Sequence, residues 1–108
     1  MVKAKSQKSK VIPCPVTAIV EIIGGKWKPM IVFNLLTGKK RFNELQRLSG
    51  NPSARVLTIQ LRELEEDRIV KREVFDQIPP KVEYSLTARG KSLNEVLEVM
   101  AQWGKQHG

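Results

Sequence analysis

The stretch FNELQRLSGNPSARVLTIQLRELEED, residues 42–67, determines the fold that this sequence predicts. Its first part carries apolar residues at helical spacing, at positions 42, 45 and 48, and its second part places leucines at 57, 61 and 64, on one helix face. Between them stand four turn-forming residues, Ser-Gly-Asn-Pro. Two amphipathic helices joined by a short turn that contains glycine form the layout of a helix-turn-helix motif.

The face of the second helix opposite its leucines carries the side chains of Arg55, Thr58, Ile59 and Arg62 and no acid, and Ser53 caps the helix. Such residues suit the major groove of DNA, because arginine recognises guanine edges and isoleucine can contact a thymine methyl group. The acidic residues gather at the far end of the helix, which fits docking by its first turns. The alternative is an ordinary solvated face, since two arginines on a helix are common.

The composition favours a small single domain that binds a polyanion. The chain has 108 residues and a formal net charge of +8, from 19 Lys and Arg against 11 Asp and Glu. One cysteine excludes an internal disulfide, and no apolar run approaches the roughly 20 residues of a membrane span, so we expect a cytoplasmic protein. Residues 1–11 predict a flexible basic tail, and 12–108 the folded domain.

Two helices are expected before the motif. The first covers 15–23, with Cys14 as its cap residue, because Pro15 suits the first helical position. The second covers 26–36 and is apolar nearly all round, which predicts a central, buried helix. Its Trp27 is expected to pack in the core rather than to contact a ligand.

A short basic turn leads into the first helix of the motif. It includes Lys40 and Arg41, two candidate phosphate contacts that could also form a minimal strand with Phe42. Asn43, with Gln46 three residues later, resembles a capping box and predicts a helix over 43–48.

A β-hairpin is predicted directly after the second helix of the motif. Residues 69–75 are rich in β-branched and aromatic side chains, and 82–86 alternate between apolar and polar. The loop between them contains two prolines and cannot pair as a strand interior. A hairpin in this position is a wing, and its Arg72 and Lys81 are candidate contacts to DNA.

A last helix is predicted over 88–105, with Thr87 as its cap. Its apolar arc is wider than a domain of this size needs, and the helix over 15–23 is also mostly apolar, so both predict a surface that binds a partner. We expect the two helices to form a homodimer interface through eight apolar side chains: Val16, Ile19, Val20, Ile23, Leu93, Leu97, Met100 and Trp103. The predicted fold is therefore α+β, mainly α: a winged helix-turn-helix DNA-binding domain with N- and C-terminal dimerisation helices.

Over about residues 13–105 the sequence resembles the HxlR-type transcription regulators, winged-helix relatives of the MarR group. The resemblance rests on several motifs in order: Cys14-Pro15-Val16, Gly24-Gly25-Lys26-Trp27-Lys28, Arg41-Phe42-Asn43-Glu44-Leu45, Leu57-Thr58, Leu61-Arg62-Glu63-Leu64-Glu65, Pro79-Pro80, Val82-Glu83-Tyr84-Ser85-Leu86-Thr87, Gly90 and Trp103-Gly104. It implies a homodimer that binds operator DNA and represses or activates transcription. It also implies that the helix beginning at Ser53 reads the major groove, that hairpin 70–86 lies on the flanking backbone or minor groove, and that the first and last helices form the dimer.

One residue departs from the family pattern. Arg68 stands where the family often has glycine after the acidic run, and an arginine ends a helix in a left-handed conformation only at some energetic cost.

Cys14 is a candidate sensor of oxidants or electrophiles. A helix N-terminus favours the reactive thiolate, and some members of the family sense oxidants through a cysteine near the N-terminus. The alternative is a small, inert cap residue.

Other function classes fit the sequence less well. An enzyme is unfavoured because the single histidine lies next to the C-terminus and no metal, cofactor or nucleophile motif is present. A winged-helix protein-interaction adaptor is the main rival, and RNA binding is a weaker one. The basic outward face of the second motif helix favours double-stranded DNA over the adaptor, and the lack of aromatic residues at exposed strand positions disfavours RNA.

Overall fold

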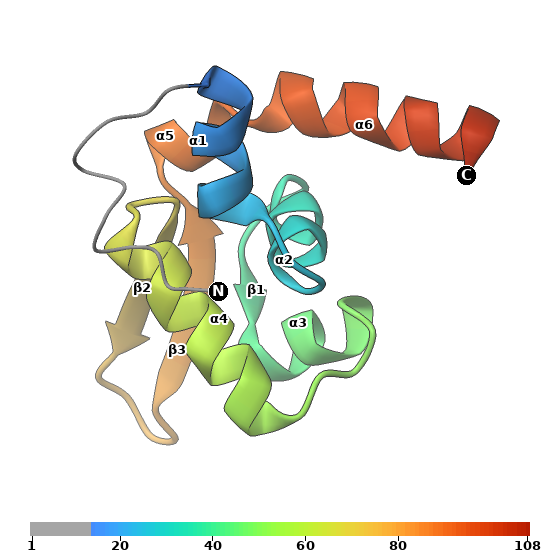
Figure 1. Cartoon of the computed structure of the whole chain (residues 1–108). Helices are drawn as coiled ribbons and strands as arrows, with labels where there is room; N and C mark the ends of the chain where they lie inside the picture. Colours follow the sequence, from blue (N-terminus) through green and yellow to red (C-terminus); the bar gives the residue numbers. More distant parts are fainter. Residues whose placement is uncertain (1–13) are drawn as a thin grey trace.

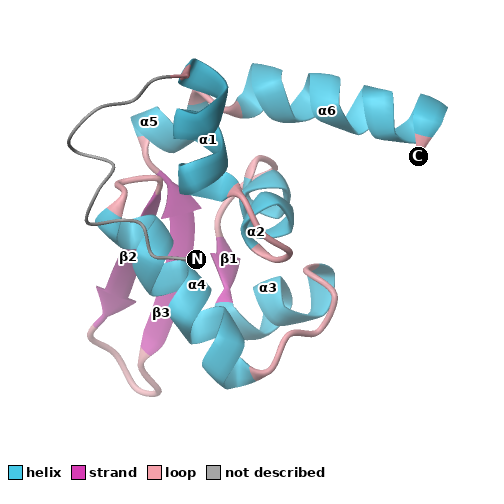
Figure 2. Ribbon diagram, viewed as in Figure 1, coloured by secondary structure: helices cyan, strands magenta, loops and turns pink. Residues whose placement is uncertain are grey.

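The computed structural model describes residues 14–108, so the predicted tail over 1–11 lies outside the described residues. Helices surround one edge and one face of a small sheet (Figures 1 and 2), which confirms the predicted α+β, mainly α, architecture. In chain order the elements are α1 Pro15–Ile23, α2 Lys28–Leu35, β1 Lys40–Arg41, α3 Phe42–Leu48, α4 Ala54–Glu66, β2 Val70–Phe75, β3 Lys81–Leu86, α5 Ala88–Lys91 and α6 Asn94–His107. In these described residues no helix is long and apolar enough to cross a membrane.

The sheet has strand order β1-β3-β2 and is antiparallel throughout. In the hairpin, Val70 pairs with Leu86 and Phe75 with Lys81, which confirms the predicted wing. Tyr84 and Leu86 alternate with more exposed residues on β3 and lie in the hydrophobic core. Four leucines, one isoleucine and one valine of α2 and α4 complete this core, so these two helices cover the inner face of the sheet.

The helix predicted over 26–36 is shorter and less buried than expected. It begins at Lys28, because Pro29 has no N–H to donate and restricts the residue before it, so the proline must lie in the first turn. Ile31 and Val32 are fully buried, but Met30 and Phe33 are 37% and 44% exposed. The prediction of burial all round is therefore wrong, and one side of α2 remains an apolar surface.

The first helix of the motif also begins differently. Its cap residue is Arg41 rather than Asn43, and the backbone N–H of Arg41 donates a hydrogen bond to Oε1 of Glu44 at 3.1 Å. Gln46, the predicted capping partner, instead donates from Nε2 to the carbonyl oxygen of Pro52 at 2.9 Å. The minimal strand at Lys40–Arg41 is confirmed.

The helix predicted over 88–105 is two helices, α5 and α6. At the break, Oγ of Ser92 donates to the carbonyl oxygen of Arg89 at 2.5 Å, and the N–H of Leu93 donates to that of Gly90 at 3.1 Å. The serine side chain thus takes the place of a regular backbone interaction. After the break α6 projects away from the rest of the molecule (Figure 1).

The end of α4 sets the direction of the wing. Arg68 has φ +61°, and its N–H donates to the carbonyl oxygen of Glu65, while the N–H of Ile69 donates to that of Leu64. This pair of bonds is the Schellman arrangement, in which glycine usually occupies the left-handed position. Ile69, the next residue, is buried and leads directly into β2.

Candidate DNA-binding surface

The helix-turn-helix consists of α3, the turn and α4, and leucines attach it to the core. Leu45 of α3 and Leu57 and Leu64 of α4 are fully buried, and Leu61 is 1% exposed. Full burial of each leucine contributes about 1.5–3 kcal/mol. Because one face of α4 is fixed in this way, the orientation of its other face is determined.

Polar contacts fix the turn between the two helices. Asn34, on α2, donates from Nδ2 to the carbonyl oxygen of Leu48 at 3.1 Å and to Oγ of the buried Ser49 at 3.2 Å. The bond from Gln46 to Pro52 closes the other side of the turn. The role of Asn34 was not predictable from the sequence, because a single polar residue in an apolar helix carries no signal of its partner.

The outward face of α4 is as predicted in composition and exposure. Oγ of Ser53 accepts a hydrogen bond from the N–H of Val56 at 3.1 Å and so caps the helix. Arg55 and Arg62 are exposed, Thr58 is half-buried, and Ile59 is 43% exposed. Two guanidinium groups, a hydroxyl and an apolar tip therefore project from one arc of the helix.

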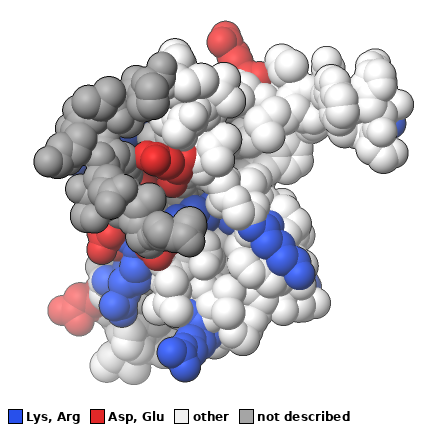
Figure 3. Space-filling model, in the orientation of Figure 1, with Lys and Arg blue, Asp and Glu red and all other residues white. Residues whose placement is uncertain are grey.

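The acids of α4 lie toward its C-terminal end, where Glu66, four residues after Arg62, continues the same arc. No acidic residue occurs in α4 before Glu63, whose Oε1 lies 2.5 Å from Nζ of Lys28, on α2. The Lys28 side chain is 9% exposed, so α2 supplies a mostly buried cation to the first acid of the helix. Figure 3 shows basic side chains near the start of α4 and no acidic side chain beside them.

Lys40 and Arg41, the two cations before α3, differ in whether their side chains are available to contact DNA. Nζ of Lys40 donates to Oγ1 of Thr37 at 2.9 Å and to the carbonyl oxygen of Gly38 at 3.2 Å, so its ammonium group is engaged within the turn. Arg41 is exposed. Of the pair, Arg41 is the better placed for a phosphate.

The wing carries as many acids as bases. Residues 70–86 contain Lys71, Arg72 and Lys81 against Glu73, Asp76 and Glu83. Nζ of Lys81 lies 4.5 Å from the centre of the Phe75 ring and 3.8 Å from Oε2 of Glu83, whereas Arg72 is exposed. The wing tip holds Ile78, which is 99% exposed.

Most of the side chains predicted to form a dimer interface lie on the surface of α1 and α6. Val16, Val20, Met100 and Trp103 are 66%, 56%, 50% and 64% exposed, and Ile19 and Leu93 are half-buried. Ile23 and Leu97 are 3% and 4% exposed and belong to the core of the chain. Their assignment to an intermolecular surface is therefore corrected, since the inner stripe of each helix packs on α2.

Cys14 is the cap residue of α1 and is exposed. Its sulfur makes no regular capping hydrogen bond, but interaction with the backbone N–H groups of Thr17, and secondly of Val16, lowers the pKa of the thiol. A lower pKa raises the fraction of thiolate at neutral pH, and the thiolate is the nucleophile.

Comparison with known proteins assigns the family. The model of the HxlR-like helix-turn-helix family matches residues 22–108. The chain is 47% identical over 106 residues to the Bacillus subtilis (strain 168) uncharacterized HTH-type transcriptional regulator YybR, covering 94% of this chain and 85% of that protein. It is 51% identical over 94 residues to YdeP of the same strain, also an uncharacterized HTH-type transcriptional regulator, covering 87% and 73%.

A solved structure agrees with this assignment. The redox regulator HypR in its oxidized form is 49% identical to the chain, with a TM-score of 0.83 over 88% of this chain and 98% of that one. The family and these relatives are regulators rather than enzymes. With the leucine-anchored motif, the basic arc of α4 and the wing in place, the chain belongs to the HxlR-like helix-turn-helix family of DNA-binding transcriptional regulators.

Proposed function

We propose that this regulator binds a roughly palindromic operator as a homodimer in the cytoplasm, with α4 of each protomer in the major groove. The observation that carries the proposal is the outward arc of α4, where Arg55 and Arg62 are exposed and the first acid of the helix is paired with Lys28. Arginine side chains in this position can form bidentate hydrogen bonds with guanine. Arg41 and Arg72 supply additional positive charge for phosphates beside the groove.

The dimer interface consists of the exposed apolar side chains of α1 and α6. Val16 and Val20 line α1, and Val99 and Trp103 line α6, each more than half exposed. An apolar surface of this kind is covered by a partner in most proteins. A two-fold dimer would place two copies of α4 about 34–36 Å apart, one helical turn of DNA.

Selection from a pool of random duplex DNA tests this function. We expect an enriched motif with two inverted half-sites, and an affinity that falls steeply as salt rises, because phosphate contacts release counterions. A pool without any enriched motif would instead favour the protein-interaction adaptor. Light scattering that shows monomers at micromolar concentration would exclude the dimer.

We further propose that Cys14 makes operator binding sensitive to oxidants. The support is an exposed thiol with a lowered pKa, in a chain similar to the redox regulator HypR. Because Cys14 is the single cysteine, the modified state is an alkylated thiol, a mixed disulfide, or a bridge between the two Cys14 residues of a dimer. Formation of the bridge removes two hydrogens, which diamide accepts as it is reduced to its hydrazide.

The test compares wild type with Cys14→Ser before and after diamide. We expect operator affinity to change only in wild type and to recover with dithiothreitol. Non-reducing electrophoresis distinguishes the bridge from a mixed disulfide. An equal response of both proteins, or of neither, would leave Cys14 with a structural role at the start of α1.

A further inference from the structure

Glu83 occupies the middle strand of the sheet, on the face opposite to the core. Its neighbour Tyr84 and the next inward residue, Leu86, belong to the core, and adjacent residues of a strand project to opposite faces. The Glu83 side chain is nevertheless only 14% exposed, and its Oε1 is buried and accepts no hydrogen bond within residues 14–108. A carboxylate with so little contact with water needs positive charge close by.

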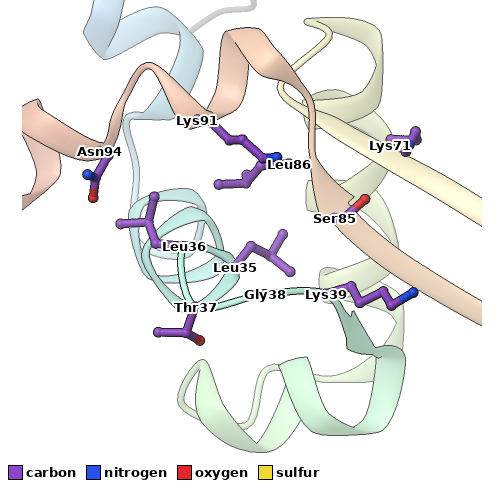
Figure 4. A pocket seen from close by; sticks show the side chains of 10 residues that line it. All are labelled: Leu35, Leu36, Thr37, Gly38, Lys39, Lys71, Ser85, Leu86, Lys91 and Asn94. Carbon is purple, nitrogen blue, oxygen red and sulfur yellow. The ribbon is translucent and has the colours of Figure 1, made fainter.

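Two lysines supply that charge. Nζ of Lys39 lies 3.3 Å from Oε1 of Glu83, and Nζ of Lys81 lies 3.8 Å from Oε2. Figure 4 shows the side chain of Lys39 extending from the segment before β1 toward β3, which also carries Ser85. The Lys81 ammonium also lies 4.5 Å from the centre of the Phe75 ring, an attractive cation–π arrangement. The carboxylate is therefore shared between two lysines, and one of them has a second partner.

The strand register places other charges beside Glu83 that it does not pair with. Glu83 is directly opposite Arg41 on one side and Glu73 on the other. Neither Arg41 nor Glu73 forms an ion pair with another residue of 14–108. Because like charges directly opposite each other are destabilising, the two lysines also offset the repulsion between Glu83 and Glu73. Glu83 thus holds Lys39 and Lys81 and leaves Arg41 available.

Both lysines lie beside the surface proposed to face DNA. Lys81 is the first residue of β3 after the wing loop, and this loop lies at the same end of the molecule as the start of α4 (Figure 1). Lys39 directly precedes the strand that ends at Arg41, the proposed phosphate contact. Free lysines at these positions would contact phosphates, which adds affinity without sequence information.

We propose that Glu83 withholds Lys39 and Lys81 from DNA phosphates and thereby limits the affinity of this regulator for DNA of any sequence. Sequence-independent binding retains a regulator on the large excess of non-operator DNA. Because Glu83 reduces this part of the affinity, the base contacts of α4 account for a larger share of the total. The proposal rests on the proposed binding of DNA, but on neither the operator sequence nor the dimer.

Fluorescence anisotropy with a random-sequence duplex, at several salt concentrations, tests this role in the variant Glu83→Gln. We expect an affinity about threefold to fivefold higher than that of wild type, and a plot of log affinity against log salt that is steeper by about 1, the contribution of one additional phosphate contact. An affinity below that of wild type in the folded variant would mean that Glu83 instead holds the wing in place for DNA, and would overturn the proposal.

The matched control is Glu73→Gln. It changes the net charge by the same amount on the same face of the sheet, but Glu73 holds neither lysine. We expect its salt dependence to equal that of wild type. If Glu73→Gln and Glu83→Gln increased the affinity and the salt dependence equally, net charge alone would explain the effect and the proposal would fail.

A triple variant, Glu83→Gln with Lys39→Gln and Lys81→Gln, tests whether the gain comes from the released lysines. Its salt dependence should return to that of wild type, because the cations that gained phosphate contacts are gone. A triple variant that keeps the steeper dependence of Glu83→Gln would contradict the assignment to these two lysines.

The selected operator separates this proposal from the proposed function. Glu83→Gln should bind the operator more tightly by the same factor as the random duplex and with unchanged base preference, because phosphate contacts carry no sequence information. If selection enriches no motif, the proposed operator function fails, while the random duplex still decides the role of Glu83. If a motif is enriched but Glu83→Gln binds the random duplex like wild type, the role of Glu83 alone is refuted.

Discussion

Replacing Arg68 by glycine should stabilise the protein, although it removes a whole side chain. Arg68 has φ +61° at the end of α4, where its N–H completes a Schellman arrangement with the Glu65 carbonyl. A non-glycine residue in this conformation costs roughly 1–2 kcal/mol. Glycine removes that cost but increases the entropy of the unfolded chain, a loss of about 0.4–1 kcal/mol. The net expectation is a gain of about 0.5–1 kcal/mol.

Thermal unfolding followed by circular dichroism measures this gain. For a domain of about 100 residues, each kcal/mol corresponds to roughly 4–8 °C in Tm, so Arg68→Gly should raise Tm by about 2–8 °C. Protein concentration must be held constant, because association also raises Tm.

Two control variants separate the backbone effect from the loss of charge. Arg68→Ala also removes the guanidinium but keeps a Cβ in the left-handed conformation, so its Tm should stay near that of wild type. Arg62→Gly places glycine inside α4 and should destabilise the protein by about 1 kcal/mol. If Arg68→Gly and Arg68→Ala had equal Tm values, backbone strain at this position would not be the cause.

Three further predictions concern the DNA-binding face, the dimer and the support of α4. Arg55→Ala or Arg62→Ala should weaken operator binding by about 1–3 kcal/mol and relax the preference for one base, as measured by anisotropy with single-base operator variants. Trp103→Asp should give a folded monomer in light scattering, because the indole is 64% exposed, lies outside the core and is proposed to contact the partner. Glu63→Gln should lower the free energy of unfolding by about 1–3 kcal/mol in urea titration, because it leaves the mostly buried Lys28 without its ion pair.

Each of these three predictions would be contradicted by a specific result. A uniform loss of affinity for all operator variants would show that the arginines contact phosphate. A Trp103→Asp variant that remains dimeric would move the interface away from the end of α6. Unchanged stability of Glu63→Gln would mean that water solvates the Lys28 ammonium.

The periodic spacing of apolar residues correctly predicted the helix-turn-helix motif and the wing. The leucines at 57, 61 and 64 all lie in the core, and the alternation over 82–86 places Tyr84 and Leu86 inward. These patterns succeed because the helix and the strand each present one face to the same core, so the period alone identifies the buried side.

Contacts between distant segments were not predictable in the same way. The break at Ser92 depends on a side-chain hydrogen bond to Arg89 that competes with the helix, and serine also occurs inside helices. The exposure of Met30 and Phe33 depends on which side of α2 faces the sheet, and an all-apolar helix carries no period that would reveal it. A pocket between α2, β3 and α5 likewise brings together residues from separate segments, among them Lys39, Lys71 and Lys91.

The order of charges along α4 reconciles an acidic helix end with DNA binding. Arg55 and Glu63 are eight residues apart, which is about 12 Å at 1.5 Å per residue. This distance exceeds the Debye length of about 8 Å at physiological salt, so the acids at the end of the helix repel the phosphates beside Arg55 only weakly. Glu63 is further compensated by Lys28. At about 0.01 M salt the Debye length reaches about 30 Å, so there the acids of the last turn should also repel the phosphates beside Arg55 and reduce operator affinity.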